Sequence, residues 1–239
     1  MRLRVLSYNI HHGEGIDRKL DLERIARVIL SVEPDLVALQ EVDCKAARTG
    51  GVDQPAELAR LTKMHVAGGG NIALQGGEYG NAVLSRWPIR RHENHKLPCF
   101  ESGEQRGMLE LEIDLPGNQP LLLLATHLDH RPKDPERLAS VKAIAAMVSP
   151  RADRPALLVG DLNDLPESPV LAEVGKQWTR TNDTHLATVP VGKTILQIDY
   201  ILFRPSGRWK ALETRVLDEA IASDHRPILA VLELAPAAD

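Results

Sequence analysis

Polar side chains recur in this sequence at the points where apolar stretches begin or end. The first stretch ends in an asparagine, the second is followed by a glutamate, and a carboxylate and an imidazole stand directly before the last one. In a sheet with antiparallel neighbours the start of one strand lies beside the end of the next, so such groups are expected to share one rim. The full set comprises Asn9, Glu41, His127, Asp161, Asn163, Asp224 and His225, together with Asp199, which lies in the middle of its apolar stretch.

The donor atoms of this set favour a hard divalent cation. Carboxylate and amide oxygens, without thiolates, are the ligands that suit Mg²⁺ or Mn²⁺. Clustered carboxylates repel one another unless a cation neutralises them, so convergence at one rim would call for a metal. A hard cation with open positions commonly binds phosphate oxygens. Asp199 could hold the His225 imidazole in one tautomer and make it a better base or a better stabiliser of negative charge.

Each of these residues also has a structural interpretation when it is taken alone. Asn9 or Glu41 alone is more often a turn residue. His127 follows a run of leucines and could be a core histidine with satisfied hydrogen bonds. Asp199 is harder to explain in this way, because an ionisable group inside an apolar strand needs a partner.

The apolar stretches predict strands, with helices between some of them. Several stretches are apolar almost throughout, which is typical of strands buried on both faces. Strands follow one another directly in places, so mixed sheets with helices outside are favoured over a parallel doubly wound fold. The glycines at 68–70 and 76–77 are interpreted as loops. Strands are expected at residues 3–7, 36–40, 82–84, 108–113, 121–125, 156–159, 195–203 and 228–234, and helices within residues 20–35, 54–64 and 133–150, the last capped by Asp134, with a short one starting at Ser168.

Composition and length favour a globular protein with a single domain, residues 1–239. Hydrophobic residues make up 43% and charged residues 26%, which are ordinary values for such proteins. The net charge of −4 gives no global attraction to nucleic acid. Cys44 and Cys99 are too few for a disulfide framework and are interpreted as structural, so a cytoplasmic location is expected. His11 and His12 are interpreted as a loop pair, since their spacing matches no helix-borne zinc motif.

Eight short motifs occur in an order that resembles the endonuclease/exonuclease/phosphatase superfamily. The motifs are LSYNIHHG, ALQEVD, YGNAVLSRWPI, EQRGMLE, LLATHLDH, LVGDLND, QIDYILF and SDHRPILA, and the resemblance runs from Arg4 to about Leu234. Each motif is weak alone, whereas eight in register are specific. The resemblance implies an α/β (α+β) fold, a four-layer sandwich in which two packed mixed β-sheets are flanked by helices.

The resemblance also implies which residues would bind a cation and activate water. Glu41 would be the principal ligand of Mg²⁺, or of Mn²⁺ in its place. Asn9 and Asp224 would lie close enough to contact that cation directly or through water. Asp161 would orient or deprotonate the attacking water, and Asn163 would hold this water and a phosphate oxygen.

Further residues are implied to act on the phosphate. His127 and His225, the latter paired with Asp199, would stabilise the negative charge that builds on phosphorus. Arg106 and Asn81 would touch the phosphate or the group attached to it, and the planar fork of an arginine suits two phosphate oxygens. The sequence leaves open whether His225 or Asp161 is the general base.

The reaction that the resemblance implies is hydrolysis of a phosphate ester by direct in-line attack of water. A small phosphodiester or phosphomonoester is favoured as the substrate, because aromatic residues make up only 3% of the chain and stacking platforms are scarce. DNA or RNA is the alternative, with residues 86–96 either a basic patch or a solvated hairpin. A binding module without activity is disfavoured, because every metal and histidine position is filled. No long hydrophobic loop for membrane insertion and no obligate protein partner are evident.

Overall fold

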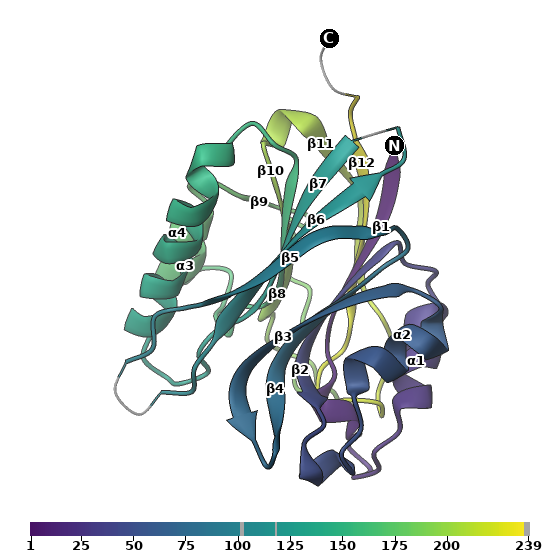
Figure 1. Ribbon diagram of the computed structural model, residues 1–239. Helices are drawn as coiled ribbons and strands as arrows, with labels where there is room; N and C mark the ends of the chain where they lie inside the picture. The colour runs from purple at the N-terminus through teal and green to yellow at the C-terminus, as the bar shows by residue number, and fades with distance from the viewer. Residues whose placement is uncertain (101–102, 118, 237–239) are drawn as a thin grey trace.

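The computed structural model describes residues 1–100, 103–117 and 119–236, and these residues form two mixed sheets of six strands each (Figure 1). The first sheet has the order β11-β12-β1-β2-β4-β3, and the second has the order β5-β6-β7-β8-β10-β9. β1 pairs in parallel with β2, and β7 pairs in parallel with β8, whereas their other neighbours are antiparallel. The strands are β1 (Arg2–Asn9), β2 (Leu36–Cys44), β3 (His65–Leu74), β4 (Gly77–Ser85), β5 (Ile89–Lys96), β6 (Gly107–Leu115), β7 (Gln119–His127), β8 (Ala156–Asp161), β9 (Thr179–Arg180), β10 (Asp199–Arg204), β11 (Trp209–Val216) and β12 (Ile228–Leu234).

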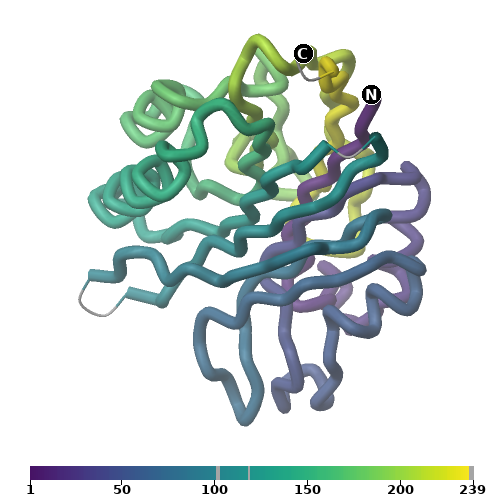
Figure 2. The backbone as a smooth tube through the Cα atoms, turned by 45° about the horizontal axis from the view of Figure 1, so that its top comes forward, coloured from purple at the N-terminus to yellow at the C-terminus, as the bar shows by residue number. Residues whose placement is uncertain are grey.

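Helices cover the outer faces of the two sheets. α1 and α2 lie on one side of the molecule and α3 and α4 on the other, with the sheets between them (Figures 1 and 2). The four-layer sandwich expected from the sequence is therefore confirmed. Within the described residues, no helix is both long and apolar enough to cross a membrane. The helices are α1 (Leu22–Leu30), α2 (Gln54–Thr62), α3 (Pro135–Val148) and α4 (Pro169–Val174), and single 3₁₀ turns are η1 (His11–Gly13), η2 (Ala47–Thr49), η3 (Ser149–Arg151) and η4 (Ser206–Arg208).

Strand β7 shows why the interior strands are apolar almost throughout. Leu123 points into the layer between the sheets and is fully buried there. Leu122 and Leu124 point to the other face and pack in the cluster that holds Val141 and Ile144 of α3. Side chains of a strand alternate between the two faces of its sheet, so a strand covered on both faces must be apolar at every position.

The helix starts follow the expected chemistry with one exception. The Asp21 carboxylate accepts a hydrogen bond from the backbone N–H of Arg24 at 2.7 Å, and Asp53 does the same for Ala56 at 3.1 Å. The prediction that Asp134 caps α3 is wrong, since its side chain makes no capping hydrogen bond. Its backbone already has near-helical angles (φ −95°, ψ −5°), whereas a capping residue usually has extended ones.

The strands that the sequence did not predict lie at the edges of the sheets. β3 and β11 border the first sheet and β5 and β9 border the second. The interpretation of glycines 68–70 as a loop is wrong, since they lie inside β3. A Cβ on Gly69 would lie 2.8 Å from the Asn94 side chain, and one on Gly80 would lie 2.0 Å from the Gly69 carbonyl oxygen. These glycines permit close backbone approach and do not mark a turn.

One predicted strand starts later than expected. The stretch 195–203 corresponds to β10, which begins at Asp199 and ends at Arg204. Ile195 is 56% exposed, and its neighbour Leu196 makes only an isolated bridge to Val189. Asp199 therefore stands at the mouth of its strand and not in the middle of it.

Candidate functional site

Polar side chains from both sheets meet at the rim where β1, β7 and β8 end. Asn9 closes β1, His127 closes β7 and Asp161 closes β8. Asp199 opens β10 directly opposite Asp161, because β10 runs antiparallel to β8. The Asn9 side-chain amide donates to Asp161 Oδ2 at 3.3 Å and so links the first sheet to the second.

An interruption of β2 aims Glu41 at this rim. The ladder between β2 and β4 shifts register between Leu39 and Val42, and Glu41 has a left-handed backbone with φ +58°. Such a conformation costs of order 1–3 kcal/mol in a residue other than glycine and is often found at functional sites. Asn9 Nδ2 donates to Glu41 Oε1 at 2.9 Å. One amide group therefore contacts the carboxylates of both Glu41 and Asp161.

His225 and Asp199 form a buried charge pair behind Asp161. His225 Nδ1 lies 3.0 Å from Asp199 Oδ2, and the Thr188 hydroxyl donates to the same oxygen. Burial alone would lower the pKa of His225, but the charge and hydrogen bond of Asp199 outweigh it and raise that pKa to about 10. The imidazole is therefore cationic at neutral pH, and its Nε2 lies 3.8 Å from Asp161 Oδ2.

His127 has the opposite protonation state. Arg106 Nη1 lies 3.0 Å from His127 Nδ1, and an arginine can only donate. His127 Nδ1 must therefore accept, which leaves the ring proton on Nε2, 3.6 Å from Asp161 Oδ2. Burial, followed by the positive charge of Arg106, holds the pKa of His127 well below its ordinary value. The rim thus combines one neutral and one cationic imidazole.

The Asp161 carboxylate is held firmly from several sides. The backbone N–H of Asn163 donates to Oδ1 at 2.8 Å, and Asn163 itself has a left-handed φ of +51°. Burial and the charge of Asp199 raise the pKa of Asp161 above its ordinary value. The preceding Gly160 has φ +149°, and a Cβ there would lie 1.9 Å from the Thr126 carbonyl oxygen of β7. Only glycine allows β7 and β8 to bring His127 and Asp161 together.

Three further residues expected at the site make contacts with the protein around it. The Asn81 amide donates to the Gly107 carbonyl at 3.1 Å, beside Arg106, and so ties β4 to the start of β6. Arg106 donates to His127 and to His130 Nδ1 and pairs with Glu104. Asp224 is exposed, and its carboxylate accepts a hydrogen bond from Ser223 at 3.3 Å.

The structure adds residues that the sequence did not indicate. Thr188 and His130 lie in segments without a periodic pattern, so no signal in the sequence could place them beside Asp199 and Arg106. His11 and His12 do lie in a short turn, as expected of a loop pair, but this turn stands next to Glu41.

Two groups of side chains in the described residues have the composition and spacing to hold a cation. The first is buried and contains Asp161, Asp199 and His225, and the second is half-buried and contains His11, His12 and Glu41. In each group one potential ligand atom per residue lies within 4.8 Å of the others. In the first group the single cationic imidazole of His225 faces two carboxylates, Asp199 at 3.0 Å and Asp161 at 3.8 Å, and Glu41 brings a further carboxylate to the same Asn9 amide.

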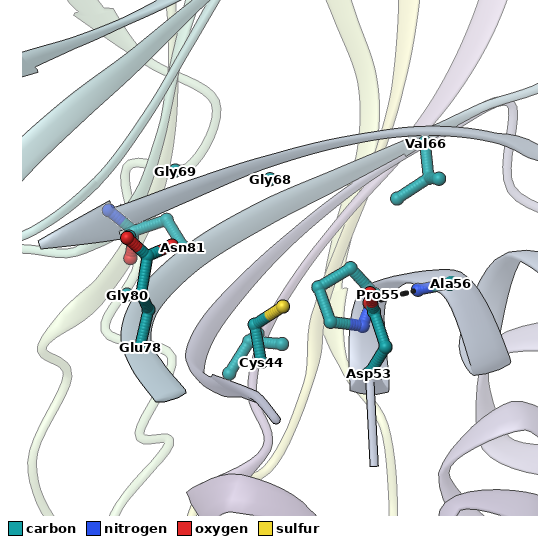
Figure 3. Close-up of a pocket in the computed structure, with 12 residues that line it drawn as sticks. Cys44, Asp53, Pro55, Ala56, Val66, Gly68, Gly69, Glu78, Gly80 and Asn81 are labelled. Carbon is teal, nitrogen blue, oxygen red and sulfur yellow. Dashed lines mark hydrogen bonds between the residues drawn. The ribbon is translucent and has the colours of Figure 1, made fainter. Parts of the chain in front are cut away.

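A separate pocket lies on the helix-covered face of the first sheet, and its lining contains none of Asn9, Glu41, Asp161 and Asp199. It has a volume of about 310 Å³ and is bordered by Cys44, Glu78 and the glycines of β3, with Asp53 and Pro55 at the start of α2 (Figure 3). Its lining includes Asn81 but neither histidine of the rim. We therefore place the candidate active site at the rim and not in this pocket.

Similar proteins have been found by sequence and by structure. Uncharacterized protein YbhP of Escherichia coli strain K12 is 28% identical over an alignment of 246 positions, which covers 97% of this chain and 96% of that protein. An endonuclease/exonuclease/phosphatase from Beutenbergia cavernae has a TM-score of 0.86 and 27% identity, with 99% of this chain and 72% of that chain covered.

A mannosyl-6-phosphatase from Bacteroides thetaiotaomicron has a TM-score of 0.81, with 97% of this chain and 100% of that chain covered. At 18% identity this likeness shows a shared fold only. The model of the endonuclease/exonuclease/phosphatase family, whose members are hydrolases acting on phosphate esters, matches residues 6–225. The chain therefore belongs to the endonuclease/exonuclease/phosphatase family.

Proposed function

We propose that this protein is a Mg²⁺-dependent phosphoesterase that hydrolyses a small phosphodiester or phosphomonoester by direct in-line attack of water, with Mn²⁺ able to replace Mg²⁺. The observation that carries the proposal is the position of Asp161. Its Oδ2 lies 3.3 Å from the Asn9 amide, 3.6 Å from His127 Nε2 and 3.8 Å from His225 Nε2. A water beside this oxygen would have a base, two imidazoles and an amide within reach.

Asp161 is the general base in this proposal. His225 is already protonated because of Asp199, so its ring has no free lone pair with which to accept a proton. The raised pKa of Asp161 brings this carboxylate closer to the working pH, where a base is most effective. Asn163 fixes the carboxylate through its backbone N–H.

The imidazoles offset the negative charge that builds on the phosphate oxygens. His225 contributes a positive charge, and His127 contributes an N–H that Arg106 holds in one orientation. Preorganised donors of this kind are each typically worth about 3–4 kcal/mol of barrier. The guanidinium of Arg106 adds positive charge beside His127, and Asn81 anchors the adjacent start of β6.

The donor set fits a hard divalent cation. Glu41 and Asp161 both accept a hydrogen bond from the Asn9 amide. This amide is neutral, so a cation beside it would reduce the repulsion between the two carboxylates. Glu41 would hold the cation, with Asn9 beside it and with the exposed Asp224 acting through water. When bound, the cation would polarise the phosphate and screen the two carboxylates.

A small ester is favoured over a nucleic acid by the pairing of the arginines in residues 86–96. Arg86 lies 2.9 Å from Asp35, Arg90 lies 3.3 Å from Asp114, and Arg91 pairs with its neighbour Glu93. The segment therefore offers paired charges and no continuous basic track. We propose that residues 1–239 form one catalytic domain, because both Asn9 and His225 are needed at the rim. We also propose a cytoplasmic location and no obligate protein partner.

The test compares hydrolysis of p-nitrophenyl phosphate, bis-p-nitrophenyl phosphate and plasmid DNA in the presence of Mg²⁺, Mn²⁺ or EDTA. We expect cation-dependent hydrolysis of a small ester that falls at least about 100-fold in Asp161→Asn, since a general base contributes about 10²–10⁴-fold. Asp183→Asn, which removes an exposed carboxylate outside the rim, is the matched control. Nicking of plasmid DNA that exceeds hydrolysis of both small esters would overturn the substrate assignment.

A further inference from the structure

The histidines that follow β1 are placed at the cation site. Each of His11, His12 and Glu41 has a potential ligand atom within 4.8 Å of the other two. Ligand atoms around one ion with bonds of about 2.0–2.2 Å are roughly 3–4.4 Å apart, so little movement would let all three bind the same ion. Glu41 is also the carboxylate that contacts Asn9.

The backbone of this turn is strained and firmly held. His11 and His12 both have left-handed angles, with φ +44° and +45°, and Gly13 follows with φ +80°. The Gln54 side chain donates to the His12 carbonyl at 2.7 Å, and the backbone N–H of His11 donates to Asn9 Oδ1 at 3.1 Å. Adjacent imidazoles would diverge on a regular strand, but these two strained residues bring their ring centroids to 4.4 Å from each other, beside Glu41.

The ring contacts leave nitrogen atoms available for a ligand. His11 Nδ1 lies 3.2 Å from the Glu14 carbonyl, which can only accept, so this nitrogen carries the proton and Nε2 keeps its lone pair. A metal-binding imidazole commonly donates its other N–H to a carbonyl in this manner. His12 Nδ1 is buried without a hydrogen-bond partner among the described residues, and Nε2 lies 3.8 Å from a Glu14 carboxylate oxygen.

We propose that His11, His12 and Glu41 together hold a divalent transition-metal ion, so that the cation site of this chain has nitrogen as well as oxygen ligands. Two imidazoles and one carboxylate suit Mn²⁺, Fe²⁺ or Zn²⁺ better than Mg²⁺, which prefers oxygen. The inference rests on the proposed function only in that both use Glu41. With these nitrogen ligands the site would prefer a transition-metal ion to Mg²⁺, whereas a site with oxygen ligands alone would not.

The experiment measures binding of Zn²⁺, Mn²⁺ and Mg²⁺ to the metal-free protein, residues 1–239, by isothermal titration calorimetry. His11→Gln and His12→Gln are each expected to weaken Zn²⁺ and Mn²⁺ binding at least about tenfold. Loss of a residue that only orients a metal ligand already lowers metal affinity by about 10–100-fold, so loss of a ligand should cost at least as much. Mg²⁺ binding should change less than about threefold, since Mg²⁺ prefers oxygen ligands. His65→Gln, which alters an exposed histidine of β3, is the matched control. Unchanged Zn²⁺ binding in both variants would overturn the assignment.

A second measurement needs no variant of His11 or His12. Pulsed electron paramagnetic resonance of the Mn²⁺-loaded wild-type protein should show hyperfine coupling to imidazole nitrogen, and its absence would overturn the assignment even if a variant failed to fold. The two proposals fail separately. Nitrogen coupling that persists in His225→Gln, which lacks the imidazole of the other candidate cation group, keeps the metal site, and without hydrolysis of any ester it refutes the phosphoesterase. Hydrolysis without nitrogen coupling does the reverse.

Discussion

Replacement of Asp199 by asparagine tests the charge pair behind Asp161. The substitution keeps the size of the side chain and an oxygen that can accept from His225, but it removes the negative charge. The two charged atoms lie 3.0 Å apart, and neither residue is more than 8% exposed. At an effective dielectric of about 20 their attraction is about 5–6 kcal/mol. Desolvation offsets part of this, and we take about 3–4 kcal/mol as the loss in transition-state stabilisation.

At about 1.4 kcal/mol per tenfold, this loss corresponds to a decrease in kcat/KM of about 10²–10³-fold for Asp199→Asn. The assay is hydrolysis of bis-p-nitrophenyl phosphate with saturating Mg²⁺ or Mn²⁺, measured across the pH range. In the wild-type protein the pKa of His225 is about 10, so the charge on its ring persists into alkaline solution. In Asp199→Asn that pKa falls, and the rate should decline at a lower pH.

Thr188→Val is the control, because it removes the second hydrogen bond to Asp199 and leaves the charge in place. A hydrogen bond to a charged group is worth about 1.5–3 kcal/mol, so this variant loses some rate, but it should keep the alkaline limb of the wild-type protein. The reasoning is refuted if Asp199→Asn keeps kcat/KM within about threefold of wild type and retains the same alkaline limb.

Three further outcomes are expected. Gly160→Ala should lower the free energy of unfolding by more than about 3 kcal/mol, because its Cβ would meet the Thr126 carbonyl oxygen, and urea denaturation within about 0.5 kcal/mol of wild type would contradict this. Arg106→Lys, which loses the planar fork that orients His127, should lower kcat more than it raises KM in steady-state assays. The pKa of Asp161 is raised in the folded protein, so a proton competes with the bound cation more strongly at pH 6 than at pH 8. Added Mg²⁺ should therefore increase Tm more at pH 8 than at pH 6. An increase at pH 8 that is equal to or smaller than the increase at pH 6 would argue against this.

The sequence predicts every interior strand of both sheets and none of the edge strands. Interior strands such as β7 are buried on both faces, and their residues form continuous apolar stretches in the sequence. The edge strand β5 exposes charged side chains such as Arg91, and β3 carries consecutive glycines, so neither has the apolar pattern of a strand. Edge strands of natural sheets commonly carry charges, which explains why hydrophobic patterning misses them.

The candidate site also has parts that the sequence predicts and parts that it does not. The meeting of Asn9, His127 and Asp161 follows from which strands end at one rim. Asp199, expected inside its strand, stands at the start of β10 instead. The orientation of the Glu41 side chain toward the rim depends on a register shift between β2 and β4, which no hydrophobic periodicity indicates. The partner of His127 depends on the path of the chain before β6, where Arg106 lies.

The rim is divided between the two sheets. Asn9 and Glu41 belong to one sheet and Asp161 to the other, and the packed leucine layer between the sheets fixes their separation. A slippage of about 1 Å would be enough to cost about 100-fold in rate. Turnover should then fail on warming before the protein melts, and Leu123→Ala, which hollows that layer, should widen the interval between the two temperatures.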